Sequence, residues 1–452
     1  MATTAKKKTA PATRGNPKRS GKAPTAKGHF QPAWHETASD EALLLSHMAY
    51  ATDEKRMEGY LRASALVPDG SPLNDVLDAF FEHTPVGLEL PLFSFIYYVS
   101  AWLTQEDVGI MVGGKKIPPA LWIVLLARSG GFKSFSSDII KRNAPVQSNL
   151  DGFESEAKMI DLMADNRREE DDNGNPLIPQ RHRWVCDEFA QTLKKIETEG
   201  GPLAGCKKYL LLAYDRAPIS RKLKSYTQTV EDTTLSFLGI NVYDTFLETM
   251  SPESLLDGFA QRFAYVIASE PLNENPPRDP KSSAYMEINT MHLEAVTAVA
   301  WSKIRQQQLL PEYELNDEAR KLFAEWSDGF AKTYDIPASF FIRLRFRLFT
   351  FALIYHILAG KGATKEIDKT SARYAALLFG ALLGHTKRML LDIGEGDLAK
   401  KLTRVLALKE KHGDEMTIRD VVMGMSGYKV TASEARALWQ IAFGSKPPAP
   451  RK

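Results

Sequence analysis

The sequence has few cysteines, no apolar run of membrane length and no secretory-type apolar segment near its start. Its 452 residues include two cysteines, Cys186 and Cys206, too few for a disulfide framework or a cysteine-based metal cluster. The longest apolar run, 346–358, is interrupted by Arg347 and His356, whereas a membrane span needs roughly 18 apolar residues. Without an apolar leader, export is not expected. These absences predict a cytoplasmic protein with no membrane contact.

The charge is small overall but unevenly distributed. The net charge is +2, yet residues 1–28 contain eight Lys or Arg and no acid, so the rest of the chain is net negative. This segment also lacks large apolar residues and therefore cannot fold alone. We expect residues 1–38 to form a disordered basic arm. The arm either contacts nucleic acid or serves as a solubilising tail, and composition favours neither.

Four short apolar runs alternate with helical stretches in the middle of the chain. They are LWIVLLA (121–127), RWVCDE (183–188), LSFLGIN (235–241) and RFAYVIAS (262–269). Apolar strands separated by helices are typical of a parallel sheet that is covered on both faces. The sequence therefore predicts an α/β fold whose core lies within residues 111–271.

Helical patterns dominate on both sides of this core. Residues 39–110 are predicted to be a helical N-terminal region, in which two helices between 73 and 103 are broken at Pro85 and Pro91. A Pro-rich linker follows position 271, and residues 284–396 are predicted to be mainly helical. Residues 397–452 show three short helical patterns, near 400–411, 417–424 and 431–443. That spacing suits a helix-turn-helix or winged-helix module, which contacts either DNA or another protein.

The first apolar run leads into a candidate phosphate-binding loop. In such a loop, backbone N–H groups at a helix start face the phosphates, a Lys reaches the β and γ oxygens, and a Ser holds magnesium. The octet here departs from G-x-x-x-x-G-K-[ST] at both glycine positions, which are Ala127 and Phe132. Ser134 is the predicted Mg²⁺ ligand of the loop. The residues predicted to bind ATP are Ser129, Gly130, Gly131, Phe132, Lys133 and Ser134.

Polar residues at the later strands complete a predicted ATPase site. Asp187 and Glu188 end the second run, about 54 residues after the Lys-Ser pair. In ring ATPases the first acid supports Mg²⁺ and the second polarises the attacking water. Asn241 ends the third run and is predicted to orient that water, and Arg262 is predicted to reach the γ-phosphate of a neighbouring subunit. The plainer interpretations are solvated acids, a turn residue and a surface salt bridge.

A basic tract lies between the second and third runs. The segment DRAPISRKLKSYTQT (215–229) contains Arg221, Lys222 and Lys224. Ring helicases often carry a pore-facing loop at this position, where such cations bind the phosphates of single-stranded DNA without sequence preference. The alternative is a solvated basic loop.

Together these segments resemble a known group of proteins. LWIVLLARSGGFKS, WVCDE, LSFLGIN and DGFAQRFAYV look like motifs of the phage, prophage and plasmid P-loop ATPases, long catalogued as a domain of unknown function and often encoded with primases. The resemblance covers roughly residues 75–360. It implies a RecA- or AAA+-like P-loop NTPase core, ATP with Mg²⁺, and a replication or mobile-element role in the cytoplasm of a bacterial host. A primase or polymerase is the implied partner.

A second resemblance concerns the helical region after the core. FFIRLRFRLFTFALIYHIL (340–358) is similar to the helical lid of minichromosome-maintenance helicases, in which a sensor-2 arginine touches the nucleotide. The resemblance gives that role to Arg343 and Arg347, which are one helical turn apart. We therefore expect an ATP-driven helicase or translocase that forms a hexameric ring on single-stranded or forked DNA. The alternatives are a replication-initiation or helicase-loading scaffold with little turnover, and a terminase-like or defence ATPase.

Overall fold

A computed structural model describes most of the chain beyond the N-terminal arm. The described residues are 66–164, 181–222, 227–250, 254–255, 257–268, 288–333, 337–395, 397–413, 416–425 and 430–443. The predicted arm, the Pro-rich linker after position 271 and Lys224 lie outside these ranges. Among the helices within them, none is both long and apolar enough to cross a membrane.

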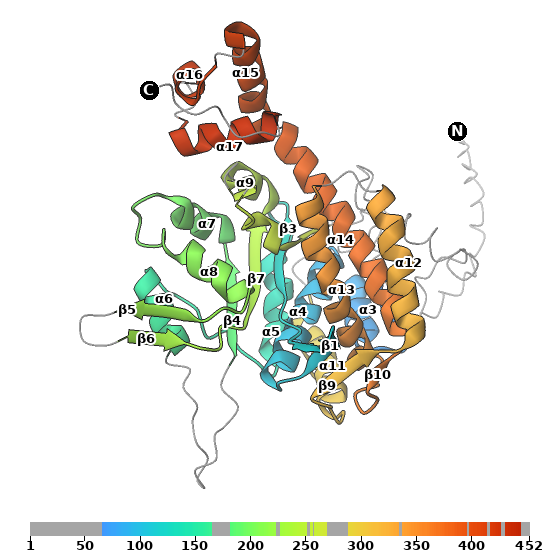
Figure 1. The fold of residues 1–452 in the computed structure, drawn as a ribbon. Helices are drawn as coiled ribbons and strands as arrows, with labels where there is room; N and C mark the ends of the chain where they lie inside the picture. Colours follow the sequence, from blue (N-terminus) through green and yellow to red (C-terminus); the bar gives the residue numbers. More distant parts are fainter. Residues whose placement is uncertain are drawn as a thin grey trace, which may run out of the picture.

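A four-stranded parallel sheet forms the centre of the molecule (Figure 1). Its strands lie in the order β4-β7-β3-β8 and coincide with the four apolar runs, so the predicted α/β fold with a parallel sheet is confirmed. All of β3 is buried, because it has a strand on each side and helices on both faces. The strands are β3 (Trp122–Ala127), β4 (His182–Asp187), β7 (Leu235–Val242) and β8 (Ala264–Ile267).

The strand order places a topological switch point at the carboxyl-terminal edge of the sheet. From β3 the chain passes to β4, returns to β7 between them, and then crosses to β8 on the other side of β3. In open α/β sheets, ligands bind outside the carboxyl ends of strands where the connections diverge in this way. The register sets Leu126 opposite Asn241 and Ile240 opposite Asp187. The predicted loop, the two acids and Asn241 therefore meet at one edge.

Helices cover both faces of the sheet. Alternate residues of β3 enter two separate hydrophobic cores: Ile123 and Leu125 enter one, and Val124 and Leu126 enter the other. The helices and one 3-10 turn of this body are α3 (Pro72–His83), α4 (Glu89–Gln105), α5 (Lys133–Asn143), α6 (Glu156–Ala164), α7 (Phe189–Glu197), α8 (Cys206–Tyr214), α9 (Tyr243–Thr249), η3 (Ala260–Arg262), α11 (Thr290–Arg305), α12 (Asp317–Thr333), α13 (Ala338–Leu358) and α14 (Lys369–Glu395).

Local signals explain where α3 and α4 begin. Ser71 caps α3 by accepting a hydrogen bond from the Leu73 amide, and Pro72 occupies the first turn, where proline is tolerated. The helix is interrupted around Pro85, as predicted. Pro91 lies in the first turn of α4, where a missing N–H breaks no helical hydrogen bond, so the second predicted break is wrong.

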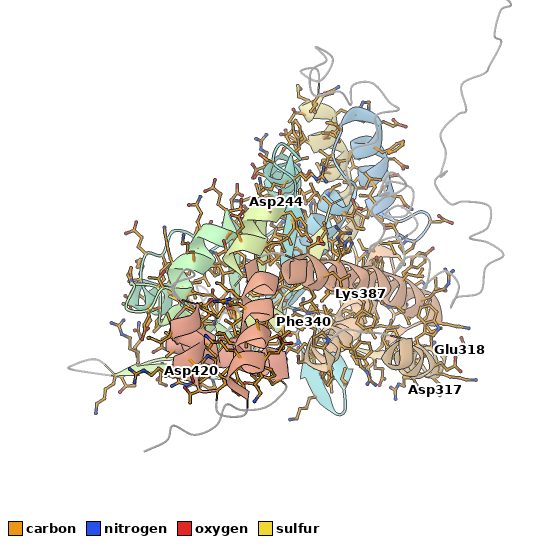
Figure 2. The ribbon with its side chains drawn as sticks, turned by 90° about the horizontal axis from the view of Figure 1, so that it is seen from above. Asp244, Asp317, Glu318, Phe340, Lys387 and Asp420 are labelled. Atoms are coloured by element: carbon orange, nitrogen blue, oxygen red, sulfur yellow. The ribbon has the colours of Figure 1, made fainter. Side chains whose placement is uncertain are left out.

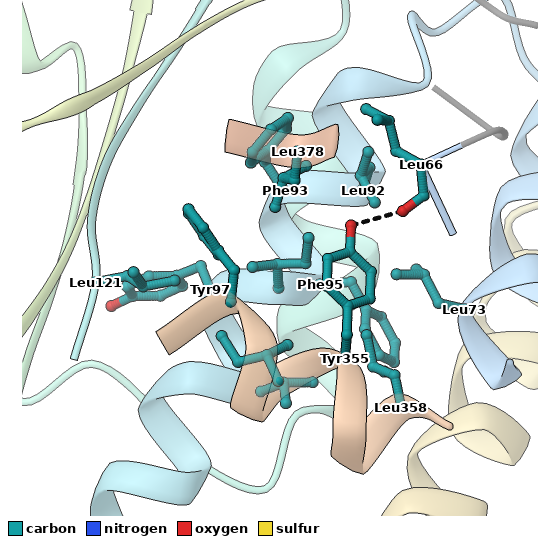
Figure 3. Packing of buried hydrophobic residues seen from close by; sticks show 14 of the residues in the cluster. Leu66, Leu73, Leu92, Phe93, Phe95, Tyr97, Leu121, Tyr355, Leu358 and Leu378 are labelled. Atoms are coloured by element: carbon teal, nitrogen blue, oxygen red, sulfur yellow. Dashed lines mark hydrogen bonds between the residues drawn. The ribbon is translucent and has the colours of Figure 1, made fainter. Parts of the chain in front are cut away.

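The helices before and after the sheet share one hydrophobic core. Figure 3 shows Phe95 and Tyr97 of α4 near Tyr355 and Leu358 of α13, and all four are at most 1% exposed. The Tyr355 hydroxyl donates to the Leu66 carbonyl at 2.6 Å, which satisfies the one polar atom of that side chain. Full burial of a large apolar side chain contributes roughly 1.5–3 kcal/mol. The N-terminal helices and the predicted lid are therefore held on the same face of the sheet.

The helix α12 closes the outer side of this layer. Seen from above, Asp317 and Glu318 lie at the rim of the molecule (Figure 2). Acids in the first turn stabilise a helix start, because they face the positive end of its dipole. Ala319, Leu322 and Phe323 are buried on the side that packs against α14.

Two smaller sheets were not predicted from the sequence. One has the order β10-β9-β1-β2, and the other is the antiparallel hairpin β5-β6, which carries Arg221 and Lys222. Their strands are short and only partly buried, so they lack a continuous apolar signal. They are β1 (Gly109–Val112), β2 (Lys115–Ile117), β9 (Glu312–Leu315), β10 (Glu366–Ile367), β5 (Ile219–Lys222) and β6 (Thr227–Val230).

The C-terminal module has a small core of its own. Val405, Val421 and Leu438 are buried in it, one from each of three helices. Thr417 and Asp420 form a capping box that starts the second helix. Figure 1 shows the module projecting from the end of α14. The helices are α15 (Asp397–His412), α16 (Ile418–Gly424) and α17 (Ala432–Phe443), close to the predicted positions.

Candidate nucleotide-binding site

The loop 128–132 joins the end of β3 to the start of α5 at the carboxyl-terminal edge. Gly130 has φ +80°, a conformation that favours glycine. Gly131 has no room for a side chain, since a Cβ would lie 3.0 Å from the Arg128 carbonyl oxygen. The Gly131 amide donates to that same carbonyl at 3.0 Å and closes a tight turn. The glycines that this loop needs thus lie inside it, not at the consensus positions.

Phe132 occupies the position of the second consensus glycine. Its φ of 54° and ψ of 27° are left-handed, which costs a non-glycine residue about 1–2 kcal/mol. The Phe132 ring lies edge-on to Phe135, with 6.0 Å between centroids, and packs against the main core. Packing of the ring therefore holds a backbone conformation that glycine would adopt without strain.

The N-terminus of α5 has the features of an anion site. No side chain caps it, so the amide groups of its first turn point past the end of the helix. Lys133, the first helical residue, makes no hydrogen bond or ion pair with any residue that the structure describes. A helix start carries a partial positive charge, and an unpaired lysine adds to it. The loop therefore suits a phosphate group.

Ser134 and Asp187 meet at this edge of the sheet. The Ser134 hydroxyl donates to Asp187 Oδ2 at 2.8 Å, although β7 lies between the strands that lead to them. A hydroxyl and a carboxylate are oxygen ligands that Mg²⁺ accepts, with water and phosphate oxygens in the remaining positions. The structure thus brings together the two predicted metal ligands. Within the described ranges, no three His, Cys, Asp or Glu side chains gather as a metal cluster.

Glu188 follows Asp187 in a second left-handed position. Its φ is 52°, and its amide donates to Asp187 Oδ1 at 2.9 Å. The exposed Glu188 carboxylate accepts a hydrogen bond from Gln191 Nε2 at 2.6 Å. Four non-glycine residues of the described chain have positive φ, and two of them, Phe132 and Glu188, lie in this site. Strained backbone gathers at functional sites, because the surrounding structure must be built to hold it.

Asn241 lies at the same edge, but protein groups engage its amide. Its Oδ1 accepts from the Ala190 amide at 3.0 Å and its Nδ2 donates to the Val242 carbonyl at 2.7 Å. The side chain is 3% exposed. Asn241 therefore satisfies an amide at the start of α7, just after Glu188, and positions that acid. Its predicted contact with water stays a prediction.

Arg262 is held inside its own subunit. It is 6% exposed, and its guanidinium donates to the Asp215 carboxylate at 2.7 Å and to the Gly258 carbonyl at 2.8 Å. The Tyr214 ring lies 5.1 Å below it. An arginine that reaches the γ-phosphate of a neighbouring subunit must project from the surface of its own subunit. In this structure the Arg262 side chain does not project in this way. It precedes β8 and so lies at the amino-terminal edge of the sheet.

Arg343 and Arg347 also lie away from the loop. Arg347 donates to the carbonyls of Trp122, at 2.5 Å, and of Arg262. Trp122 is the first residue of β3, and at ~3.3 Å per residue the strand places it roughly 16 Å from its far end. The structure does not bring the two predicted sensor arginines together with the loop of the same chain. Arg347 is instead buried at the amino-terminal edge of the sheet, where β3 and β8 begin.

The site contains one residue that the sequence argument missed, and one buried thiol. Gln191 contacts Glu188 from one helical turn away, a spacing that the sequence does show. The Cys186 thiol, next to Asp187, has its pKa raised to about 11 by burial. The thiol is therefore protonated near neutral pH.

The basic hairpin contacts Asp161 through a side chain from each of its strands. Arg221 lies 3.9 Å from Asp161 of α6, and Gln228 Nε2 donates to the same carboxylate at 3.2 Å. Lys222 is exposed, and Lys224 falls outside the described residues. Figure 1 shows the hairpin extending away from the main sheet. Its cations are thus separate from the loop and acids.

Comparison with known proteins adds no relative to this picture. No protein-family model matches the chain, and no curated protein matches it. The chemistry of the site therefore follows from its geometry: an uncapped helix start, an unpaired lysine, a hydroxyl paired with a carboxylate, and a second carboxylate beside them.

Proposed function

We propose that this chain is a P-loop ATPase and acts as an ATP-driven helicase or translocase on DNA. The observation that carries the proposal is the 2.8 Å hydrogen bond between Ser134 and Asp187. It joins the start of α5 to the acidic strand at the switch point of the sheet, where ligands bind in folds of this class. A strand that merely ends in two solvated acids has no reason to contact a Lys-Ser helix start.

Each residue of the site has a proposed part in phosphoryl transfer to water. ATP would supply the γ-phosphoryl group and leave as ADP, and Mg²⁺ would neutralise the charge of the phosphates. Loop amides and Lys133 bind the phosphates, and Ser134 and Asp187 hold the metal ion. Glu188 orients the attacking water and accepts its proton, while Gln191 fixes the direction of the carboxylate. Positioning and charge compensation then supply most of the rate increase.

The DNA part of the proposal depends on the basic hairpin and on the family resemblance. Arg221 and Lys222 belong to β5, and Lys224 is two residues further along the sequence. Such cations bind nucleic-acid phosphates electrostatically, without regard to sequence. A hexameric ring in a phage or mobile-element replication system, with a primase or polymerase as partner, is the form that the resemblance suggests.

A second candidate function is a replication-initiation or helicase-loading scaffold that binds nucleotide with little turnover. Two observations favour it. Phe132 strains the loop where glycine is usual, and Arg262 is paired with Asp215 inside its own subunit. Both features slow hydrolysis more than they weaken binding, because neither removes a ligand of the phosphates or of Mg²⁺.

The deciding experiment measures ATP binding and hydrolysis, with and without single-stranded DNA, alongside native mass. Lys133→Ala should abolish binding or hydrolysis, because it removes the cation at the helix start. Lys141→Ala, in the last turn of the same helix, is the matched control and should behave as the parent. Unchanged hydrolysis in Lys133→Ala would refute the P-loop assignment. Hydrolysis that DNA stimulates supports the helicase, whereas binding with negligible turnover supports the scaffold.

The DNA site is tested by neutralising Arg221, Lys222 and Lys224 together. Single-strand affinity should fall and depend less steeply on salt, because fewer counterions are released on binding. ATP binding should survive, since the hairpin and the loop are separate. An unaltered salt dependence would move the DNA contact to the basic arm or to the C-terminal module.

A further inference from the structure

A second cavity opens at the amino-terminal edge of the sheet, away from the candidate nucleotide site. Its volume of about 610 Å³ is within the range of ligand-binding pockets. Trp122 and Leu235, the first residues of β3 and β7, form part of its wall. The helix α13 contributes another part, and the end of α8 a third, with Asp215 and Arg216. None of the residues proposed for ATP hydrolysis lines it.

Arginines dominate the charge of this cavity. Arg343 and Arg216 line it, and neither side chain has an ion pair or hydrogen bond within the described residues. The guanidiniums of Arg343 and Arg262 converge: a Cβ on Gly258 would lie 3.3 Å from one and 3.1 Å from the other. The Nε of Arg262 is buried without a partner. Asp215 is the one acid among the described lining residues, and Arg262 already engages it.

Two large apolar side chains stand at the mouth of the cavity. Ile342 is 51% exposed and Phe346 is 62% exposed, and they lie one helical turn apart on α13. Exposed apolar side chains rimmed by polar residues are a feature of protein–protein contact sites and ligand-binding grooves. A nucleic-acid strand needs a track of cations along its backbone, and this cavity offers two arginines that no described residue engages, beside an apolar wall.

We propose that this cavity docks an acidic peptide of a partner protein, with a bulky apolar side chain adjacent to two or three carboxylates. The carboxylates pair with Arg343 and Arg216, and guanidinium–carboxylate pairs are the stronger kind of hydrogen bond. The apolar side chain enters beside Phe346 and Ile342. This function goes beyond ATP hydrolysis and does not depend on it, because the two sites share no residue.

The test uses fluorescence anisotropy with a labelled peptide of three aspartates followed by phenylalanine. The full-length protein should bind it, bind more weakly as salt rises, and ignore the matching peptide of three lysines. Arg343→Glu should lower the affinity about tenfold or more, because it loses a charge-assisted pair and adds repulsion. Phe346→Ser should lower it as well. Arg345→Glu is the matched control, since Arg345 is exposed on the same helix but does not line the cavity.

Several results would overturn the proposal. They are no binding of the aspartate peptide, equal binding of the lysine peptide, or equal loss in Arg343→Glu and Arg345→Glu. Tighter, competing binding of single-stranded DNA would assign the cavity to nucleic acid, and a changed native mass in Arg343→Glu would assign it to contacts between copies. ATP binding and urea unfolding of Arg343→Glu should match the parent. The peptide-binding result can therefore be interpreted even if the ATPase proposal fails, because the peptide assay does not depend on ATP hydrolysis.

Discussion

Replacing Arg347 distinguishes a structural arginine from one that touches nucleotide. The side chain is 6% exposed and donates to the carbonyls of Trp122 and Arg262. These carbonyls belong to the start of β3 and to the turn before β8, so one guanidinium ties two neighbouring strands of the sheet together. Arg347→Ala removes both bonds and leaves the two carbonyl oxygens without this charged donor.

The expected loss follows from these two bonds. A hydrogen bond to a charged group contributes about 1.5–3 kcal/mol, so loss of the two bonds in Arg347→Ala should lower the unfolding free energy by about 3–6 kcal/mol. That is a large share of the 5–15 kcal/mol typical of a domain. Arg347→Lys should lose less, because one ammonium keeps one of the bonds. Arg345→Ala, exposed on the same helix, should change stability by no more than about 0.5 kcal/mol.

The assay is urea unfolding at 25 °C for the parent and the three variants, with ATP affinity measured on the folded proteins. We expect Arg347→Ala to unfold at lower urea with an unchanged slope and to bind ATP as the parent does. The reasoning is refuted if Arg347→Ala unfolds at the same urea concentration as the parent but binds ATP tenfold or more weakly. Arg347 would then reach a nucleotide, as the resemblance to helicase lids predicts.

Three further predictions concern the site and its sheet. Phe132→Gly should preserve ATP affinity or raise it, since it relieves about 1–2 kcal/mol of backbone strain against some lost ring packing; a tenfold loss in a binding titration contradicts this. Glu188→Gln should bind ATP but hydrolyse it slowly, whereas Asp187→Asn should weaken Mg²⁺-dependent ATP binding. If both variants hydrolyse ATP at the parental rate, neither acid takes part in catalysis. Burial lowers the pKa of His182 from 6.5 to about 4. Protonation thus favours the unfolded chain, and the unfolding free energy should fall by up to about 3 kcal/mol from pH 6.5 to 4, a slope that His182→Gln should flatten.

The main sheet was predictable because its signal is local. Each central strand is a continuous apolar run that must be buried on both faces, so β3 and β7 begin and end within a residue or so of the predicted runs. The loop and the acids follow these strands directly, and parallel strands carry them to the same edge. The contact between Ser134 and Asp187 therefore follows from two local predictions and one rule about strand direction.

The positions of the arginines were not predictable in this way. Arg347 contacts a strand start 225 residues earlier, and Arg262 pairs with Asp215 across 47 residues. The hydrophobic pattern of neither segment indicates a partner so far away in the sequence. Arg262 was given a role at the nucleotide from its place before a strand, and Arg347 from the resemblance to helicase lids. Neither argument considers the end of the sheet at which the side chain lies. The small sheet with β1 and β9 was missed for a related reason, since its strands are short and partly exposed.

The position of β7 gives a physical reason why the acids and the loop form a site and not merely a contact. Adjacent strands lie about 4.8 Å apart, so β3 and β4, with β7 between them, are separated by roughly 10 Å. Direct neighbours would bring the acids against the loop and leave no space for a phosphate and a water molecule. With β7 inserted, the Ser134 side chain still reaches Asp187, while Glu188 stays exposed beyond it. Asn241, at the end of the inserted strand, then holds the turn that carries Glu188 through the Ala190 amide. In the proposed ATPase, the spacing for the ligand and the side chain that fixes the acid therefore both come from β7.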